Sequence, residues 1–431
     1  MKIEALYNIY KQYPLISTDT RNIKEESIFF ALKGASFDGN TFADQALLSG
    51  ARYVVVDDPT RKKDERYILV DDVLETLQRL AEYHRDQLHI PIIGITGTNG
   101  KTTSKELLYA VLSQRYKTFA TLGNLNNHIG VPLSILSISK DIEIAIIEMG
   151  ANHLGEISFL SKIAKPTHGL ITNVGKAHLE GFGSFEGVKI AKGELYDYLQ
   201  DHHGILFLQG DNIHLVEMAK KRHIDTVVRY GFGAENNVIG KLLIANPYLA
   251  ITWKERNNSA TYEVSTNLTG SYNTENFLAA IAVGLHFGVD PIAINTGIAS
   301  YIPKNNRSQI TKTDRNTVIA DFYNANASSM AAALDNMKVL SAERKVLVLG
   351  DMFELGEDAY EEHALVIQKA KELLLERLIF VGKEFYKHKC EGAEFFESTT
   401  EALIPMATIS GCFVLLKASR GMSFERLLEA L

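Results

Sequence analysis

Short apolar runs, each followed by a stretch with helical spacing, recur along most of this chain. This alternation is expected where parallel β-strands are joined by helices that cover the sheet. It predicts an α/β protein with parallel sheets. The runs predicted to be buried strands are PIIGIT (91–96), IEIAIIEM (142–149), GLITNV (169–174), TVIADF (317–322), KVLVLG (345–350), RLIFVG (377–382) and CFVLLK (412–417).

Helical periodicity is clear in two segments. In the first, apolar residues repeat at i, i+1, i+4 and i+5, which predicts one buried helix face. These residues are Leu107, Leu108, Val111 and Leu112. The second segment, AYEEHALVIQKAKELLLERL (359–378), predicts a helix whose apolar side carries Leu365, Ile367 and Leu373 to Leu375. A more polar stretch from about 234 to 268 has the alternation of antiparallel strands instead.

The length of 431 residues implies two or three domains, because a single hydrophobic core rarely grows so large. The polar segment IPKNNRSQ (302–309) is typical of a linker. We therefore predict three domains: residues 1–84, residues 85–305 and residues 306–431.

Composition narrows the function classes. The net charge of −7 provides no basic surface for nucleic acid. The two cysteines, Cys390 and Cys412, have no metal or disulfide spacing, which fits a reducing compartment. The N-terminus MKIEALYNIY lacks the pattern of a signal peptide, and no apolar run reaches about 18 residues. We expect a cytoplasmic protein that binds neither nucleic acid nor membrane.

The stretch GITGTNGKTTSKELL (94–108) carries the clearest candidate chemistry. A predicted strand ends there, a predicted helix begins, and the glycines let successive N–H groups point at an anion held at the helix N-terminus. Lys101 is expected to reach the β- and γ-phosphates of a nucleotide, and the Thr102 hydroxyl to reach Mg²⁺. The commonest phosphate loop would need a glycine where Ile95 stands, so this loop is a variant. The alternative is a glycine-rich turn without a ligand.

Three further residues lie where a nucleotide enzyme could use them. Glu148 ends a predicted strand, and ligands of open α/β sheets bind at the carboxyl ends of strands, so its carboxylate is a candidate Mg²⁺ ligand. The alternative is a glutamate that faces solvent. His178 follows the next strand and is equally compatible with a structural role. Lys192 lies in a helical segment, where a surface lysine would be ordinary.

Taken together, several motifs resemble the Mur ligases, the ATP-dependent amide-forming enzymes of peptidoglycan precursor synthesis. The motifs are TGTNGKT (96–102), EMGANHLGEI (148–157), ITNVGKAHLEGFGS (171–184), AKGEL (191–195) and LTGSYNTENFLAA (268–280). The family's own loop has the TGTxGKT form, which accounts for Ile95. The resemblance implies a small N-terminal α/β domain that binds a uridine nucleotide, a central phosphate-loop domain with a parallel sheet, and a C-terminal Rossmann-like domain.

The remaining motifs resemble the family member that adds a dipeptide. They are TLGNLNNHIGVPLS (121–134), DFYNANASSM (321–330), LGDMFELGE (349–357) and LLKASRGMSFE (415–425). The segment STDTRNI to LLSGA (17–51) resembles the uridine-nucleotide-binding N-terminal domain of the members that add the third amino acid and of those that add the terminal dipeptide. The resemblance implies that D-alanyl-D-alanine is joined to a UDP-N-acetylmuramoyl-tripeptide, in cell wall biogenesis and hence in cell shape and division. The substrate-binding residues that it implies are Ser17, Thr18, Asp19, Asn126, Asn127, Asn324 and Asn326. For the two last asparagines, the alternative is that they cap a helix that starts near Ser328.

The resemblance also implies ATP, two Mg²⁺ ions and a monomer. One ion is expected on Thr102 and Glu148, and the second on Glu148, His178 and Lys192, with Lys192 carbamylated because an ammonium cannot bind a cation. The nucleotide-binding residues implied are Gly97, Thr98, Asn99, Gly100, Lys101, Thr102, Thr103, Asn273, Asn276, Arg307 and Asp321. Lys101, Glu148, His178 and Lys192 form the expected catalytic set.

Three other functions remain as alternatives. A nucleotide switch would need NKxD-like and DxxG segments, which do not occur at suitable places. A sibling ligase, either a diamino-acid-adding enzyme or a folylpolyglutamate-type ligase, is closer, although the DNPR-like segment usual in the diamino-acid enzyme is missing. A non-catalytic binding module is the third, and the intact catalytic set argues against it.

Overall fold

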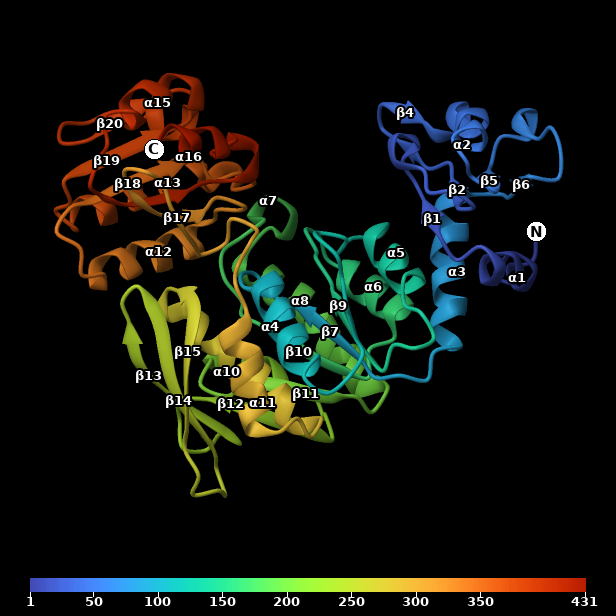
Figure 1. Ribbon diagram of the computed structural model, residues 1–431, viewed down its shortest axis with the longest axis horizontal. Helices are drawn as coiled ribbons and strands as arrows, with labels where there is room; N and C mark the ends of the chain where they lie inside the picture. Colours follow the sequence, from blue (N-terminus) through green and yellow to red (C-terminus); the bar gives the residue numbers. More distant parts are fainter.

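The computed structural model describes residues 1–431, apart from the side chain of Leu179, and has three α/β lobes arranged as a V (Figure 1). The N-terminal lobe contains a four-stranded parallel sheet in the order β1-β2-β5-β6. Its strands are β1 (Ile16–Ser17), β2 (Ile28–Phe30), β5 (Tyr53–Val56) and β6 (Tyr67–Leu69), and a hairpin joins β3 (Lys33–Gly34) to β4 (Phe37–Asp38). Its helices are α1 (Ile3–Gln12), α2 (Ala43–Leu48) and α3 (Val73–Asp86), with 3₁₀ turns η1 (Thr20–Asn22), η2 (Gly39–Phe42) and η3 (Pro59–Arg61).

Helix α3 joins the first lobe to the central one. It runs from the N-terminal sheet down to helices α5 (Gly130–Leu136) and α6 (Glu156–Ala164) of the central lobe (Figure 1). One continuous hydrophobic cluster extends from Tyr10 and Leu77 to Ile135. The Tyr10 hydroxyl also donates to the Leu136 carbonyl at 2.6 Å. The expected boundary at residue 84 lies in the last turn of this helix.

The central lobe is built on a nine-stranded sheet in the order β15-β14-β13-β12-β11-β10-β7-β9-β8. The seven strands from β13 to β8 pair in parallel, and β14 and β15 extend the sheet as antiparallel strands. The strands are β7 (Ile92–Thr96), β8 (Thr118–Ala120), β9 (Ile144–Glu148), β10 (His168–Ile171), β11 (Ile205–Gln209), β12 (Thr226–Gly231), β13 (Val238–Ala245), β14 (Tyr248–Glu255) and β15 (Tyr262–Thr269). The predicted parallel strands and the predicted antiparallel segment are both confirmed.

Helices cover both faces of this sheet. Helices α4, α10 and α11 pack on one face and share a core with Ile93 and Ile95 of β7, whereas α5, α6 and α8 pack on the other. The helices are α4 (Lys101–Leu112), α5 (Gly130–Leu136), α6 (Glu156–Ala164), α7 (Leu179–Phe182), α8 (Phe185–Asp201), α9 (Ile213–Lys220), α10 (Thr274–His286) and α11 (Pro291–Ser300), with the 3₁₀ turn η4 (Ser271–Asn273). The predicted stripe of α4, from Leu107 to Leu112, is confirmed, since all four of its apolar residues are fully buried.

The C-terminal lobe has a six-stranded sheet in the order β16-β17-β21-β18-β19-β20, parallel except for β16. Its strands are β16 (Gln309–Lys312), β17 (Thr317–Asp321), β18 (Lys345–Gly350), β19 (Arg377–Val381), β20 (Glu394–Phe396) and β21 (Phe413–Lys417). Its helices are α12 (Ala327–Val339), α13 (Ala359–Lys371), α14 (Lys383–Tyr386), α15 (Thr399–Met406) and α16 (Glu425–Ala430), with η5 (Gly356–Asp358) and η6 (Arg420–Met422). The doubly wound arrangement agrees with the Rossmann-like expectation.

The expected apolar side of α13 is wrong in part. Leu365 is 53% exposed and Leu374, beyond the end of the helix, is 91% exposed. The buried face carries His363, Val366, Ile367 and Ala370, which follow the i, i+3, i+4, i+7 spacing. Leu365 and Ile367 are two residues apart, so their side chains point to nearly opposite sides of a helix.

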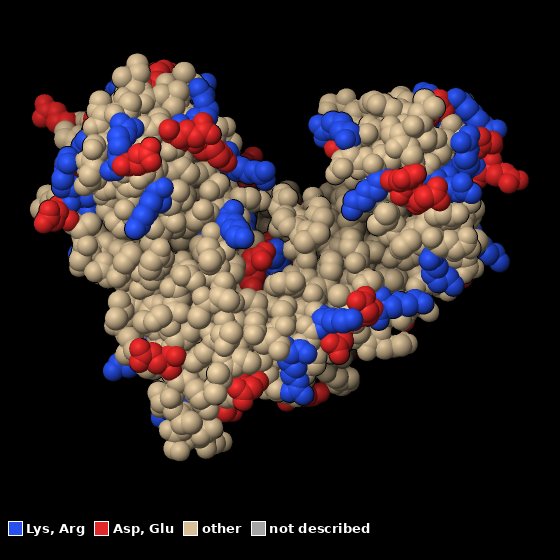
Figure 2. Space-filling model, in the orientation of Figure 1, with Lys and Arg blue, Asp and Glu red and all other residues tan. Residues whose placement is uncertain are grey.

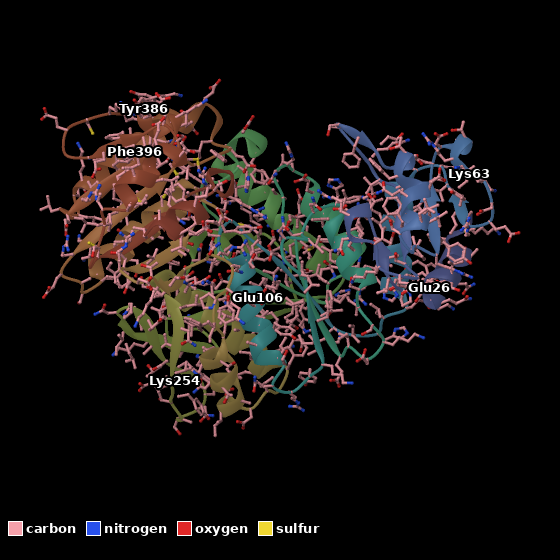
Figure 3. All side chains as sticks on the ribbon, turned by 45° about the horizontal axis from the view of Figure 1, so that its top comes forward. Glu26, Lys63, Glu106, Lys254, Tyr386 and Phe396 are labelled. Carbon is pink, nitrogen blue, oxygen red and sulfur yellow. The ribbon has the colours of Figure 1, made fainter. Side chains whose placement is uncertain are left out.

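The V leaves a deep hollow between its arms, with charged side chains at its floor (Figure 2). Glu106 of α4 lies near the middle of the molecule, between Lys63 of the N-terminal lobe and Tyr386 of the C-terminal lobe (Figure 3). Among the residues described, no helix is both long enough and apolar enough to cross a membrane.

Candidate active site

Three neighbouring strands of the central sheet end at one place. In the order β10-β7-β9, the phosphate loop follows β7, Glu148 ends β9, and the segment 172–178 follows β10. Because these strands are parallel, their carboxyl ends lie along one edge of the sheet, where ligands bind in open α/β folds. The predicted residues of three separate motifs therefore meet.

The phosphate loop needs glycine at two positions. Gly97 has φ +142° and Gly100 has φ +78°, both in a region that other residues rarely adopt. A β-carbon on Gly97 would lie 2.0 Å from the Thr172 hydroxyl, and one on Gly100 would lie 2.9 Å from the Asn276 side chain. Close packing on both sides thus fixes the loop at the start of α4, where a phosphate would face the helix N-terminus.

The segment that follows β10 also holds the phosphate loop in place. The Asn173 side chain accepts from the Asn99 backbone N–H at 2.9 Å and donates to the Asn99 carbonyl at 3.1 Å. The Thr172 hydroxyl donates to the same carbonyl at 2.6 Å. These bonds hold the loop in a conformation prepared for an anion, so little reorganisation is needed on binding.

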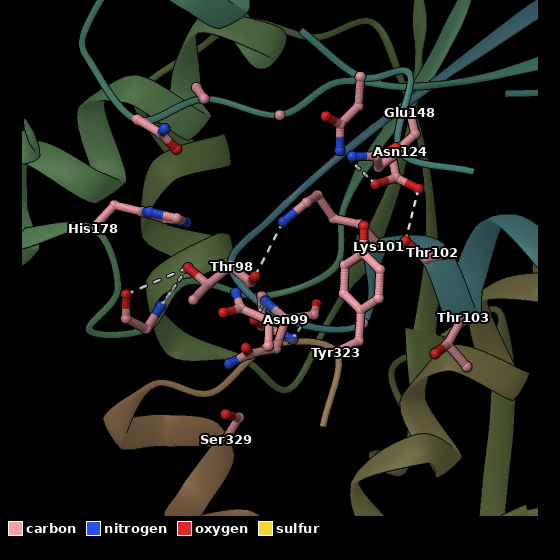
Figure 4. A pocket seen from close by; sticks show the side chains of 18 of the residues that line it. Thr98, Asn99, Lys101, Thr102, Thr103, Asn124, Glu148, His178, Tyr323 and Ser329 are labelled. Carbon is pink, nitrogen blue, oxygen red and sulfur yellow. Dashed lines mark hydrogen bonds between the residues drawn. The ribbon is translucent and has the colours of Figure 1, made fainter. Parts of the chain in front are cut away.

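Lys101 lies over its own loop (Figure 4). Its ammonium donates to the carbonyls of Gly97 at 2.7 Å and Thr98 at 3.1 Å. Desolvation lowers the pKa of Lys101, the nearby Glu148 carboxylate opposes this shift, and Arg307 adds to it. Lys101 and Arg307 therefore place two positive charges close together, an arrangement that an anion would stabilise.

Glu148 is almost completely buried, so the solvent-facing alternative is wrong. The Thr102 hydroxyl donates to one of its oxygens at 3.0 Å (Figure 4). The Asn126 side chain donates to the other at 2.8 Å. The ammonium of Lys105, also buried, lies 3.9 Å from the carboxylate and donates to the Thr121 carbonyl at 2.6 Å. A hydroxyl and a carboxylate side by side are the hard oxygen ligands that suit Mg²⁺.

His178 connects the central lobe to the C-terminal lobe. Its Nδ1 lies against the carboxylate of Glu354, from the loop after β18, and the proximity of His178 lowers the pKa of Glu354. The backbone of His178 has φ +51°, a strained conformation for a residue with a side chain. A second pair crosses the same interface, where Lys176 lies 3.0 Å from Glu362.

Lys192 is buried inside the central lobe, so the surface-lysine alternative is wrong. Its ammonium donates to the Ala151 carbonyl at 3.2 Å and lies 5.1 Å from the Phe182 ring centroid. Burial, together with the charge of Lys101, lowers the pKa of Lys192 to about 7. Near neutral pH much of this amine is uncharged, which is the form that can add CO₂.

The C-terminal lobe contributes an ion pair and a cationic stack. Lys417, at the end of β21, is buried and lies 2.7 Å from Asp321 at the end of β17, and Asp321 also accepts from the Ser308 backbone. The Arg307 guanidinium stacks on Tyr323, 3.7 Å from its ring centroid. Asp321, Arg307 and Tyr323 all line the same cavity.

The two asparagines of the DFYNAN segment have different roles in the structure. Asn326 is the N-cap of α12 and forms a capping box with Ser329, as the capping alternative predicted. Its side-chain amide also donates to Asn99 of the phosphate loop at 2.8 Å. Asn324 instead lines the cavity, and its side-chain oxygen accepts from the Ala325 backbone at 2.9 Å.

Asn273 and Asn276 lie beneath the phosphate loop. Asn276 donates to Asn273 at 2.9 Å and accepts from Ser104 at 3.0 Å, and Asn273 donates to the Thr269 carbonyl at 2.7 Å. Both line the cavity and support α4 from the side of α10. Their expected contact with the adenine stays a prediction.

The cavity between these groups has a volume of about 860 Å³. The predicted residues that line it are Thr98, Asn99, Gly100, Lys101, Thr102, Thr103, Asn126, Asn127, Glu148, His178, Asn273, Asn276, Arg307, Asp321 and Asn324. Ser17, Thr18 and Asp19 lie in the N-terminal lobe, where Asp19 caps η1 and pairs with Arg21. The structure does not bring these three to the cavity, and their contact with substrate stays a prediction.

Sequence reasoning missed several residues of the cavity region. Lys105, Asn173, Glu354, Lys417 and Arg420 lie inside or beside motifs that were recognised, but no spacing rule marks them. In the described part of the chain, no cluster of three or more His, Cys, Asp or Glu side chains could hold a metal. Any metal bound here must therefore use other groups as well, such as the Thr102 hydroxyl.

Comparison with known proteins gives matches along the whole chain. Three family models match: the Mur ligase family catalytic domain at residues 12–85, the Mur ligase middle domain at 95–284 and the Mur ligase glutamate ligase domain at 306–419. The UDP-N-acetylmuramoyl-tripeptide–D-alanyl-D-alanine ligase of Bacillus subtilis is 35% identical, over 96% of this chain and 92% of its own length.

Two solved structures of the same kind of enzyme superpose closely. MurF of Acinetobacter baumannii has a TM-score of 0.85 at 31% identity, covering 96% of this chain and 92% of its own. MurF ligase of Thermotoga maritima in complex with ADP has a TM-score of 0.85 at 27% identity, covering 96% of both chains. A folylpolyglutamate synthase from Thermotoga maritima, with a TM-score of 0.61 at 15% identity, shares the fold alone.

Proposed function

Because the chain belongs to the Mur ligase family, we propose that it joins D-alanyl-D-alanine to the carboxylate of a UDP-N-acetylmuramoyl-tripeptide at the expense of ATP. The observation that carries this proposal is the nearly full-length relationship to ligases of that activity. The cavity supports it, because a phosphate loop on the central lobe faces loops of the C-terminal lobe across one space. The product is a precursor of peptidoglycan.

The reaction needs an activated carboxylate, since oxide is too poor a leaving group for an amine to displace. Transfer of the γ-phosphoryl group of ATP to the tripeptide carboxylate gives an acyl phosphate and ADP. The dipeptide amine then attacks the carbonyl carbon, a tetrahedral intermediate forms, and phosphate leaves as the amide is made. Two anions must meet in the first step, so positioning and charge neutralisation account for most of the catalysis.

Most of the residues that position the phosphates and neutralise their charge lie in the central lobe. Lys101 leaves its own loop carbonyls and binds the β- and γ-phosphates, while the loop N–H groups and the N-terminus of α4 hold them in line. Arg307, from the C-terminal lobe, adds a second positive charge close to Lys101. Asn173 and Thr172 keep the loop in place throughout.

The groups around Glu148 fit Mg²⁺. Thr102 and Glu148 would hold one ion, because their oxygens already lie 3.0 Å apart and both residues line the cavity. His178 and a carbamylated Lys192 would join Glu148 around a second ion. Mg²⁺ would neutralise the charge that builds up between the phosphates and the attacking carboxylate. The contacts of Asn126 and Lys105 with the Glu148 carboxylate fix its orientation.

Lys192 fits carbamylation on two counts. Its amine is buried, and its pKa of about 7 makes the neutral form abundant near neutral pH. A carbamate is an anion, which would match the positive charges of Lys101 and the metal ions better than an ammonium does. The Ala151 carbonyl that now accepts from Lys192 would need to be released.

A substrate-dependent phosphate assay tests the proposed function. We expect phosphate release only when ATP, UDP-N-acetylmuramoyl-tripeptide and D-Ala-D-Ala are all present, with the pentapeptide product visible by mass spectrometry. Release with UDP-N-acetylmuramoyl-dipeptide and a diamino acid, or with a folate and glutamate, would favour a sibling activity instead. Release that needs ATP alone would contradict the ligase proposal altogether. We also propose that the enzyme acts in the cytoplasm as a monomer, which sedimentation can check.

A further inference from the structure

The dipeptide that enters this reaction carries two charges. Its amine must face the acyl phosphate, and its terminal carboxylate lies at the other end, at most about 7 Å away for two residues. A carboxylate held in a partly dry cavity needs a positive partner, and a planar guanidinium offers two parallel hydrogen bonds to it. The partner must therefore be a cation at the cavity wall, close to the reacting carbon.

Four lysine and arginine side chains line the cavity: Lys101, Arg307, Lys417 and Arg420. Lys101 belongs to the phosphate loop, and Arg307 lies near enough to affect its charge. Lys417 is buried and paired with Asp321 at 2.7 Å. Among the described residues, neither Arg307 nor Arg420 forms an ion pair. Because Arg307 lies close enough to Lys101 to share its phosphates, Arg420 is the cation left for a carboxylate.

Arg420 lies at the edge of the C-terminal sheet that faces the phosphate loop, where it can reach a bound dipeptide. It begins η6, directly after β21, and β21 pairs with β17, whose following loop carries Asn324. The carboxyl ends of both strands face the phosphate loop, as the bond between Asn326 and Asn99 demonstrates. A dipeptide lying across these two strand ends would have its amine toward the γ-phosphate position and its carboxylate toward η6.

The backbone that carries Arg420 is firmly anchored, although its side chain is exposed. Ser419 is buried, and its hydroxyl accepts from the Phe353 backbone at 3.2 Å. The Thr399 hydroxyl donates to the Met422 carbonyl at 2.5 Å. The guanidinium lies 5.3 Å from the Tyr323 ring centroid, and its Nη1 donates to the Tyr323 hydroxyl at 3.5 Å. Arg420 and Tyr323 thus lie in contact at the wall of the same cavity.

We propose that Arg420 binds the terminal carboxylate of the incoming D-Ala-D-Ala and so selects an amine that carries a free acid. The inference rests on the proposed function and adds the residue that recognises the second substrate. The competing role is that Arg420 binds a phosphate of ATP, as Arg307 is expected to do. The two roles predict different substrate dependence.

The test compares D-Ala-D-Ala with D-Ala-D-alaninamide, which keeps the amine and loses the negative charge. For the unmodified enzyme we expect kcat/KM to favour the acid. In Arg420→Gln, kcat/KM for the acid should fall about 10- to 100-fold, mainly through KM, because a hydrogen-bonded charge pair is lost. The value for the amide should stay within about threefold, so that the preference nearly disappears. The KM values for ATP and the tripeptide should not change.

Two further variants separate the effect of charge from that of the planar guanidinium and provide a control. Arg420→Lys keeps the charge without the planar fork, and should restore part of the preference for the acid. Arg426→Gln changes an exposed arginine six positions later, bonded only to Thr400 in the described residues, and should behave as the unmodified enzyme does. Equal losses for acid and amide in Arg420→Gln, or a rise in the KM for ATP, would overturn the inference. An unmodified enzyme that ligates neither dipeptide would overturn the proposed function itself, and this inference with it.

Discussion

The side-chain amide of Asn326, at the start of α12, donates a hydrogen bond of 2.8 Å to the side-chain oxygen of Asn99 in the phosphate loop. Asn99 in turn donates to the Ser328 hydroxyl at 2.8 Å. The loop that would hold ATP is therefore bonded to the lobe that would present the second substrate. Figure 4 shows the loop between Glu148 of the central lobe and Ser329 of the C-terminal lobe.

This contact can be separated from the capping role of Asn326 by two substitutions. Asn326→Asp keeps an acceptor for the Ser329 N–H, so the free energy of unfolding should stay near that of the unmodified enzyme, but a carboxylate cannot donate to Asn99. Its kcat/KM for ATP should fall, about 10-fold or more, since the new charge also repels phosphate. Asn326→Ala should lose both functions and about 1 kcal/mol of stability. Thermal unfolding and steady-state kinetics check both, and equal kinetics in Asn326→Asp and the unmodified enzyme would argue that the contact has no catalytic role.

Lys101 provides the most direct test of the phosphate loop. Lys101→Ala should lower kcat about 10²- to 10³-fold, because a charge that stabilises the transferring phosphoryl group is removed. Lys117, an exposed lysine of the same lobe with 67% of its side chain accessible, is the matched control. Its alanine variant should keep full activity. Near-normal ligation by Lys101→Ala would contradict the assignment of the loop.

Much of the central lobe could be predicted from sequence because its signals are local. Buried strands, the stripe of Leu107 to Leu112 and the glycine positions of the loop each follow from neighbouring residues. Glu148 and Lys192 were weaker predictions, since a single carboxylate or lysine carries no spacing signal. Their burial depends on packing from β9, α6 and α8, which only the folded chain reveals.

The residues that the C-terminal lobe adds to the cavity could not be predicted from local sequence signals. Glu354 meets His178, and Arg420 meets Tyr323, only because loops from separate strands converge and two lobes lie against each other. Leu365 shows the opposite error, in which an apolar residue was assigned to the core although its helical position faces solvent. Pairings between distant segments are set by topology, and a single sequence does not contain that information in readable form.

Carbamylation of Lys192 should depend on pH and on CO₂. The pKa is lowered to about 7, so the amine is mostly protonated below about pH 7 and mostly neutral above it, and only the neutral form adds CO₂. We therefore expect activity to fall as the pH drops below about 7, and to fall further in CO₂-depleted buffer. A ¹³C carbamate resonance should appear with labelled bicarbonate and be missing in Lys192→Ala. That variant should be nearly inactive, and short carboxylic acids should partly restore it.

Lys189, one turn earlier on α8, is the control for this experiment. Its ammonium pairs with the exposed Glu186 carboxylate, which stabilises the charged form, so it lacks the unpaired, fully buried setting of Lys192. Lys189→Ala should retain both the resonance and the activity. A carbamate signal that survives in Lys192→Ala, or full activity of that variant without added acid, would contradict the assignment.

Asn324 gives the complementary test to Asn326. Its side-chain oxygen already accepts from the Ala325 N–H, so its amide hydrogens remain to bind the dipeptide across the cavity, and they suit the carbonyl in the middle of D-Ala-D-Ala. Asn324→Ala should raise the KM for the dipeptide about 3- to 10-fold, the usual cost of one hydrogen bond, and leave the KM for ATP unchanged. The midpoint of thermal unfolding should barely move, because α12 keeps its cap at Asn326. Asn326→Ala should give the reverse pattern, with lower stability and impaired use of ATP. If Asn324→Ala instead loses stability and keeps its KM for the dipeptide, Asn324 supports the turn before α12 and does not bind substrate.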